Sequence, residues 1–104
     1  MKMMNRDSFT NSLLSTISES RKVSRYTYQL LQTEVSRIGA FAAVKNMLRR
    51  SMSTFRLPKD YDLFWMNGRM DLMVENLVLD PRYIHLFTVE EIAFCRELIS
   101  PKAA

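Results

Sequence analysis

The stretch GRMDLMVENLVLDPRYIHLFTVEEI, residues 68–92, decides the fold, because it places several helix starts close together. Asp80 precedes Pro81, the order expected of an N-cap and the first residue of a helix. Thr88 precedes Glu91 by three positions, which is a capping box. Asp71 lies before the apolar run LMVENLVL and is predicted to be another N-cap. The stretch therefore predicts short helices whose polar residues serve the backbone, with the last helix beginning after Thr88.

The N-terminal region predicts a helix over about residues 8–19. Phe9, Leu13 and Ile17 are spaced four apart and share one helical face. The opposite face is rich in Ser, Thr and Asn, which are weak helix formers. Such a helix gains order by docking, either on its own body or on a partner. We expect residues 1–25 to form an N-terminal helix or arm, with docking on its own body and contact with a partner as equal alternatives.

Three further helices are predicted before the opening stretch. Ser24 is a plausible N-cap for a helix that ends at Gly39, and a third helix begins at Ala40. Residues 49–62 contain Ser, Thr and Pro and form the predicted linker, and Pro58 suits the first turn of a short fourth helix. The chain has 104 residues with only 2 Gly and 3 Pro. We expect an all-α fold, a compact bundle of five to six short helices in a single domain with a single core.

Charge is unevenly distributed along the chain. Residues 1–59 contain 11 Lys or Arg and 3 Asp or Glu, a balance of +8, whereas residues 60–104 have a balance of −4. The two halves, or two copies of the chain, could attract each other. A basic half could also contact the phosphates of a nucleic acid. The residues that would form this nucleic-acid surface are Arg21, Lys22, Arg25, Lys45, Arg49, Arg50, Arg56 and Lys59.

Catalytic and metal-binding patterns are weak. Asp71 and Glu75 are four apart, but no second acidic or His pair exists to complete a metal site, so we expect one cap and one solvated side chain. His85 lies in an apolar context and is expected to be half-buried. Cys95, the single cysteine, falls on the apolar face of the last helix and should pack as a core residue. We expect no enzyme activity, no metal and no cofactor.

Protein binding is the function that the sequence favours. Aromatic and Met side chains are common at interface centres and on adaptable binding surfaces. Trp65 could equally serve as a core anchor. The residues predicted to contact a protein partner are Phe9, Leu13, Ile17, Trp65, Met66, Met70 and Met73. A homodimer through the N-terminal stripe is an alternative.

The elements GAFAAV at residues 39–44, GRMDL at 68–72, ENLVL at 75–79 and LFTVEE at 86–91 resemble a family of small bacterial all-helical domains of uncharacterised function. The resemblance covers residues 26–99, and the chain lacks the double glycine that the family pattern has before its third helix. It implies a small helical module and no activity or cofactor. We expect a cytoplasmic, non-enzymatic protein-binding module, such as a small bacterial or phage regulator or inhibitor of a larger complex. A nucleic-acid-binding accessory protein is the alternative.

Overall fold

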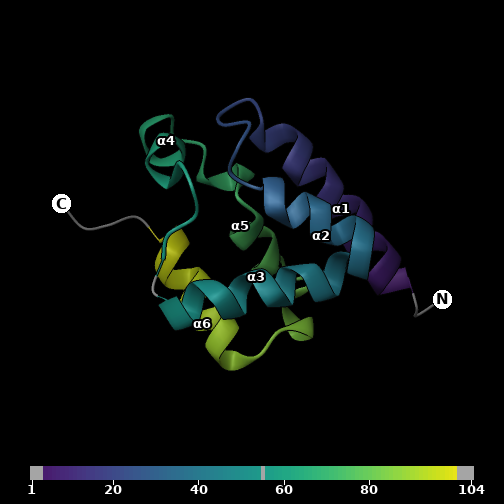
Figure 1. The fold of residues 1–104 in the computed structure, drawn as a ribbon. Coiled ribbons are helices and arrows are strands. Elements are labelled where there is room, and N and C mark those ends of the chain that lie inside the picture. The colour runs from purple at the N-terminus through teal and green to yellow at the C-terminus, as the bar shows by residue number, and fades with distance from the viewer. Residues whose placement is uncertain (1–3, 55, 101–104) are drawn as a thin grey trace.

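The computed structural model describes residues 4–54 and 56–100, with side chains from residue 8 onward. Within these residues the fold is all-α, as predicted, and no strand is present (Figure 1). The α-helices are α1 (Met4–Ser20), α2 (Gln29–Ile38), α3 (Ala40–Thr54), α4 (Tyr61–Met66), α5 (Val74–Val78) and α6 (Val89–Ile99). Two 3-10 helices, η1 (Met70–Leu72) and η2 (Ile84–Leu86), flank α5 in the chain.

The corner between α2 and α3 depends on Gly39. Its φ of 94° and ψ of 158° lie in a region that only glycine adopts without strain. The Gly39 N–H donates to the Val35 carbonyl at 3.0 Å, and the next residue, Ala40, already belongs to α3. The side chains of Ala40 and Ala43 are buried, and their small size allows α2 and α3 to pack closely. The predicted helix end at Gly39 and helix start at Ala40 are confirmed.

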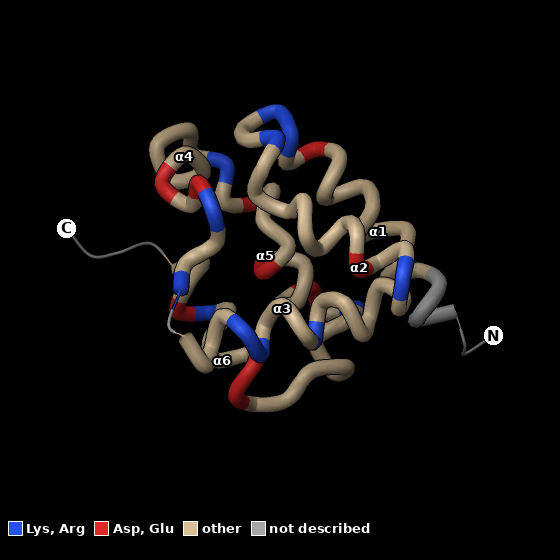
Figure 2. The backbone as a smooth tube through the Cα atoms, viewed as in Figure 1, with Lys and Arg blue, Asp and Glu red and all other residues tan. Residues whose placement is uncertain are grey.

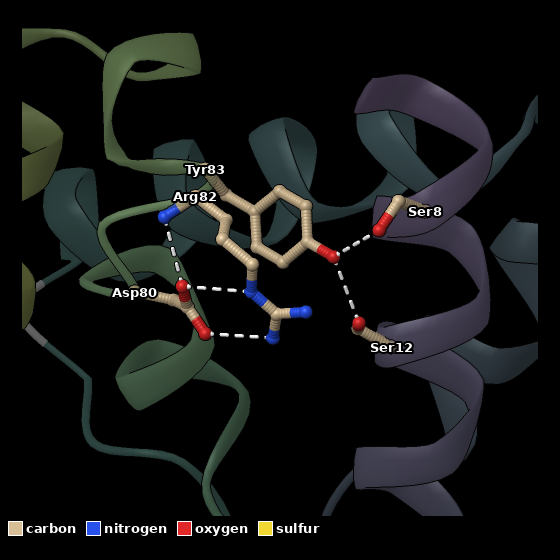
Figure 3. A network of polar contacts seen from close by, with 5 residues as sticks. All are labelled: Ser8, Ser12, Asp80, Arg82 and Tyr83. Atoms are coloured by element: carbon tan, nitrogen blue, oxygen red, sulfur yellow. Dashed lines mark hydrogen bonds and ion pairs between the residues drawn. The ribbon is translucent and has the colours of Figure 1, made fainter. Parts of the chain in front are cut away.

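Helix α1 docks on the body of its own chain. Phe9, Leu13 and Ile17 belong to the main core, and the Phe9 ring lies 5.3 Å from the Tyr83 ring, centroid to centroid. Figure 3 shows the Tyr83 hydroxyl between two serines of α1, at 2.6 Å from Ser8 Oγ and 2.9 Å from Ser12 Oγ. Of the two alternatives for the N-terminal segment, the structure therefore shows docking on its own body.

The buried side chains form a large cluster and a small one. The large cluster joins α1, α2, α3, α5 and α6, and α5 lies near the centre of the molecule in Figure 1. The small cluster joins α4, η1 and the end of α6 through Tyr61, Phe64, Leu72, Met73 and Leu98. The Tyr61 hydroxyl donates to the Leu98 carbonyl and accepts from Trp65 Nε1 at 2.6 Å. The bundle thus has a smaller satellite beside its main core.

The last predicted helix start is confirmed. Thr88 Oγ1 accepts from the Glu91 N–H at 3.1 Å, and Glu91 Oε1 accepts from the Thr88 N–H at 2.9 Å, which completes the capping box. The Asp80 carboxylate also accepts a backbone N–H, from Arg82 at 2.8 Å, and pairs with the Arg82 guanidinium (Figure 3). The predicted helix start at Asp80 and Pro81 is wrong, however, because residues 81–83 form turns and η2 begins only at Ile84, after Tyr83.

Two further predicted N-caps are wrong. Asp71 lies inside η1 and pairs with the exposed Arg69 at 3.1 Å, while α5 starts at Val74 without a side-chain cap. Ser24 lies ahead of α2, which begins at Gln29. Ser24 Oγ instead accepts from the Tyr26 N–H and donates to the Asp60 carboxylate in the linker. In both cases the short polar side chain bonds to groups other than the first N–H groups of the following α-helix.

Candidate functional site

The most unusual polar residue of the fold is Glu75. Its side chain is 0% exposed, so the expectation of a solvated carboxylate is wrong. The Tyr28 hydroxyl donates to Glu75 Oε1 at 2.7 Å and accepts from the Val74 N–H at 2.9 Å. Glu75 Oε2 is buried and has no hydrogen-bond partner among the described residues. A buried carboxyl with one unsatisfied oxygen costs free energy, which makes this residue the first candidate for a function.

Burial dominates the electrostatics around Glu75. It raises the pKa of Glu75, and the hydrogen bond from Tyr28 offsets this only in part. Burial also raises the pKa of Tyr28 well above its ordinary value, and the charge of Glu75 adds to the effect. The Cys95 thiol faces the same pair from α6, and burial raises its pKa too. All three groups therefore favour their uncharged forms, because burial penalises the charged form of each.

A cavity of about 140 Å³ opens beside Glu75, between α2, α3 and the linker. Its walls are mostly apolar, and two buried polar atoms without a described partner belong to its lining residues, Glu75 Oε2 and Thr27 Oγ1. The lining residues are Thr27, Tyr28, Leu30, Leu31, Met47, Arg50, Ser51, Pro58 and Glu75. We call this the Glu75 cavity.

The Glu75 cavity shares lining residues with two neighbouring surface hollows. Leu30 lines both the cavity and a hollow bordered by Arg21 and Arg25, and Arg50 lines both the cavity and a hollow bordered by Arg56 and Leu57. The three hollows therefore adjoin each other along α2 and the end of α3. We call them together the α2–α3 groove. Leu30 and Leu57 are each 58% exposed in it.

The groove keeps a positive charge because few ion pairs join the basic half of the chain to the acidic half. Among the described residues, Lys45–Glu91 at 2.7 Å is the ion pair that joins the basic half to the acidic half. The other described ion pairs lie within one half. Figure 2 shows basic residues gathered in the hinge that follows α1. Arg25 and Arg56 make no ion pair within the described residues, and Arg21 binds only the neutral Gln32.

The predicted protein-contact residues do not form one surface. Phe9, Leu13, Ile17 and Met73 are buried in the two clusters, so they cannot contact a partner in this fold. Trp65 and Met70 are half-buried against the small cluster. Met66 is 79% exposed and is the member of the set that remains accessible. The prediction failed for these buried residues because an apolar stripe indicates burial, but the sequence does not say whether the same chain or a partner covers it.

Several of the predicted nucleic-acid residues are engaged by neighbouring side chains of the same chain. Lys45 Nζ lies under Phe41 and Phe87, 5.5 and 5.4 Å from the ring centroids, and pairs with Glu91. Three others are held by neighbours: Lys22 by Glu19, Arg49 by Asn46 and Arg50 by Glu34. Within this set, the exposed members that make no ion pair with a described residue are Arg21, Arg25, Arg49, Arg56 and Lys59.

Of the remaining predictions from the sequence, some are confirmed and others are wrong. Cys95 is a fully buried core residue, as expected, whereas His85 is exposed instead of half-buried. Asp71 and Glu75 are not brought together, since one is on the surface and the other is in the core. Within the described part of the chain, no three His, Cys, Asp or Glu side chains are grouped as metal ligands.

Sequence reasoning missed Thr27, Leu30 and Leu57. A signal for the burial of Glu75 was present, because it is the only charge in the run LMVENLVL. Comparison with family models, with curated proteins and with solved structures yields no match. The resemblance to a family of small bacterial helical domains therefore stays a prediction. No helix in the described residues has the length and apolar character needed to cross a bilayer.

Proposed function

We propose that this chain is a non-enzymatic protein-binding module whose α2–α3 groove binds a partner segment that carries both apolar and acidic side chains. The observation that supports it is the pair of exposed leucines, Leu30 and Leu57, lying in a groove bordered by Arg21, Arg25 and Arg56. The role would be that of a small regulator or inhibitor of a larger complex.

The chemistry of the groove fits such a segment. Covering an exposed leucine stabilises a complex by up to about 1.5–3 kcal/mol. Arginines without an internal carboxylate partner favour an acidic segment and speed its association through long-range attraction. Arginine is also enriched among the residues that dominate interface energetics. A leucine flanked by arginines therefore selects for an apolar residue that has an acidic neighbour.

The test is a selection of peptides from a random library displayed against the immobilised full chain. We expect enrichment of sequences that combine Asp or Glu with large apolar residues. The selected peptides should bind Leu30→Ser and Leu57→Ser more weakly than the unaltered chain. Val89→Ser is the matched control, because Val89 is 79% exposed and lies on α6 outside the groove residues.

Two outcomes would overturn the proposal. Selection of peptides without acidic residues would remove the charge argument. Loss of binding in Met66→Ser but not in Leu30→Ser would move the contact to the surface around Trp65 and Met66.

Nucleic-acid binding is the second candidate, supported by the exposed cations of the basic half that lack an ion pair in the described residues. If DNA or RNA is the ligand, Arg49→Ala with Arg50→Ala should weaken binding and flatten its dependence on salt. Absence of DNA and RNA binding at low salt would remove this candidate and leave the protein-binding proposal untouched.

A further inference from the structure

We propose that the Glu75 cavity is a binding site for a small uncharged group that both donates and accepts hydrogen bonds, of the primary carboxamide class, with Glu75 and Thr27 as its polar contacts. The group could be a free amide or the Asn or Gln side chain of a segment bound in the groove. The site rests on the cavity and its polar atoms and does not require the proposed protein partner.

The first argument is the pair of unsatisfied atoms. Glu75 Oε2 and Thr27 Oγ1 are buried and have no described partner, and both residues line the same cavity. Buried polar atoms are nearly always hydrogen-bonded in folded proteins. Two such atoms from different elements beside one cavity are therefore the pattern expected where a ligand supplies the missing partners.

The second argument is the position of the proton on Glu75. The Tyr28 hydroxyl accepts from the Val74 N–H, so its own proton points to Glu75 Oε1. When Glu75 is uncharged, its proton consequently resides on Oε2, the oxygen without a partner. Oε2 is then a donor, while the hydroxyl of Thr27 can donate or accept. A primary carboxamide offers a carbonyl acceptor and two N–H donors and can satisfy both.

The third argument concerns charge. Arg50 lines the cavity and pairs with Glu34 at 3.3 Å, so a cationic ligand would meet a guanidinium. An ion of either sign would also have to leave water for a cavity whose walls are mostly apolar. An uncharged group avoids the cost of desolvating an ion.

The volume of the cavity limits the size of the ligand. At about 140 Å³ it is close to the apolar cavity of about 150 Å³ that accommodates benzene in another protein. Propionamide is smaller than benzene, and its ethyl group could contact the apolar side chains of Leu31, Met47 and Pro58.

The experiment is a titration of the full chain, labelled with ¹⁵N, with three probes of similar size: propionamide, propylammonium and propionate. Propionamide should give saturable shifts at the amides of Thr27, Val74 and Glu75, and the two charged probes should give weaker ones. Thr27→Val, which keeps the shape of the side chain, should weaken propionamide binding about fivefold, the effect of one lost hydrogen bond. Thr33→Val is the matched control, because Thr33 is exposed on α2 in the neighbouring hollow.

A second variant keeps the test decisive if a substitution disturbs folding. Ser51→Leu places a larger side chain in the cavity wall from α3 and should abolish the propionamide shifts without touching Glu75. Absence of saturable shifts in the unaltered chain, tighter binding of propylammonium, or equal binding by Thr27→Val would each overturn the proposal. Competition between propionamide and a peptide selected on the groove would assign the site to a partner side chain, and independent binding would assign it to a free ligand.

Discussion

The Tyr28 hydroxyl lies 2.7 Å from Glu75 Oε1 and 2.9 Å from the Val74 nitrogen, and so joins the start of α2 to the first turn of α5. Helix α5 has no side-chain cap of its own, since Met73 occupies its N-cap position. Tyr28 therefore performs through tertiary structure the role that a local Asp or Ser performs elsewhere. The shortest α-helix of the described chain is held at the centre of the fold by this bond.

Tyr28→Phe should lower the free energy of unfolding by about 1–3 kcal/mol, because it leaves Glu75 Oε1 and the Val74 N–H unsatisfied in the core. Urea unfolding followed by circular dichroism measures the change. Tyr26→Phe is the control, because Tyr26 is 49% exposed, and it should stay within about 0.5 kcal/mol of the unaltered chain. Equal stability of the two variants would show that the buried hydroxyl is dispensable.

The free energy of unfolding should depend on pH through the titration of Glu75. Burial raises its pKa, so the folded protein keeps a proton that the unfolded chain releases near about pH 4.3. The free energy of unfolding attributable to this group therefore falls as pH rises from the ordinary glutamate pKa to the raised one, and is level above it. Tyr28, at the N-cap of α2, and Cys95 from α6 face Glu75, and their own pKa values are raised, so both stay protonated in this window.

The measurement for this effect is urea unfolding of the unaltered chain and of Glu75→Gln across about pH 4–8. The glutamine variant cannot ionise, so its curve should lack the decline, and the difference between the two curves isolates Glu75. Parallel curves would show that Glu75 titrates alike in the folded and unfolded states.

Substitutions at two neighbouring positions of α1 should differ in their effect on stability, because one side chain is buried and the other is exposed. Leu13→Ala should destabilise the fold by about 2–5 kcal/mol, because Leu13 is fully buried. Leu14→Ala is the matched control at the next position, where the side chain is 43% exposed, and its effect should be much smaller. Thermal unfolding monitored by circular dichroism compares them. Comparable melting temperatures would mean that α1 is not docked in solution.

Thr88→Ala should destabilise the protein by about 1 kcal/mol through the lost cap on α6. The same change should leave binding to the α2–α3 groove intact, since Thr88 does not line it. Urea unfolding and the selected-peptide binding assay provide the two readouts. A variant with full stability and lost binding would assign Thr88 a functional role.

The sequence by itself determined the features whose physics is local. The glycine at position 39 adopts a conformation that other residues enter only with strain, and the two glycines and three prolines leave long helical segments uninterrupted. The capping box of Thr88 and Glu91 is readable because its partners are three residues apart. The apolar face of α1 was also readable, because helical spacing specifies which side chains share a side.

Only the tertiary structure decided what covers each face and which polar groups meet. The stripe of Phe9, Leu13 and Ile17 is covered by the body of the chain, and periodicity carries no information about the identity of the cover. The bond between Tyr28 and Glu75 joins residues 47 positions apart, so no local pattern announces it. Asp71 had the sequence context of a cap, yet its carboxylate pairs with Arg69. Helix α5 is short and central, and its burial comes from contacts with several distant elements. Long-range packing therefore buries the Glu75 carboxylate beside a cavity, although the sequence predicts it to be exposed to solvent.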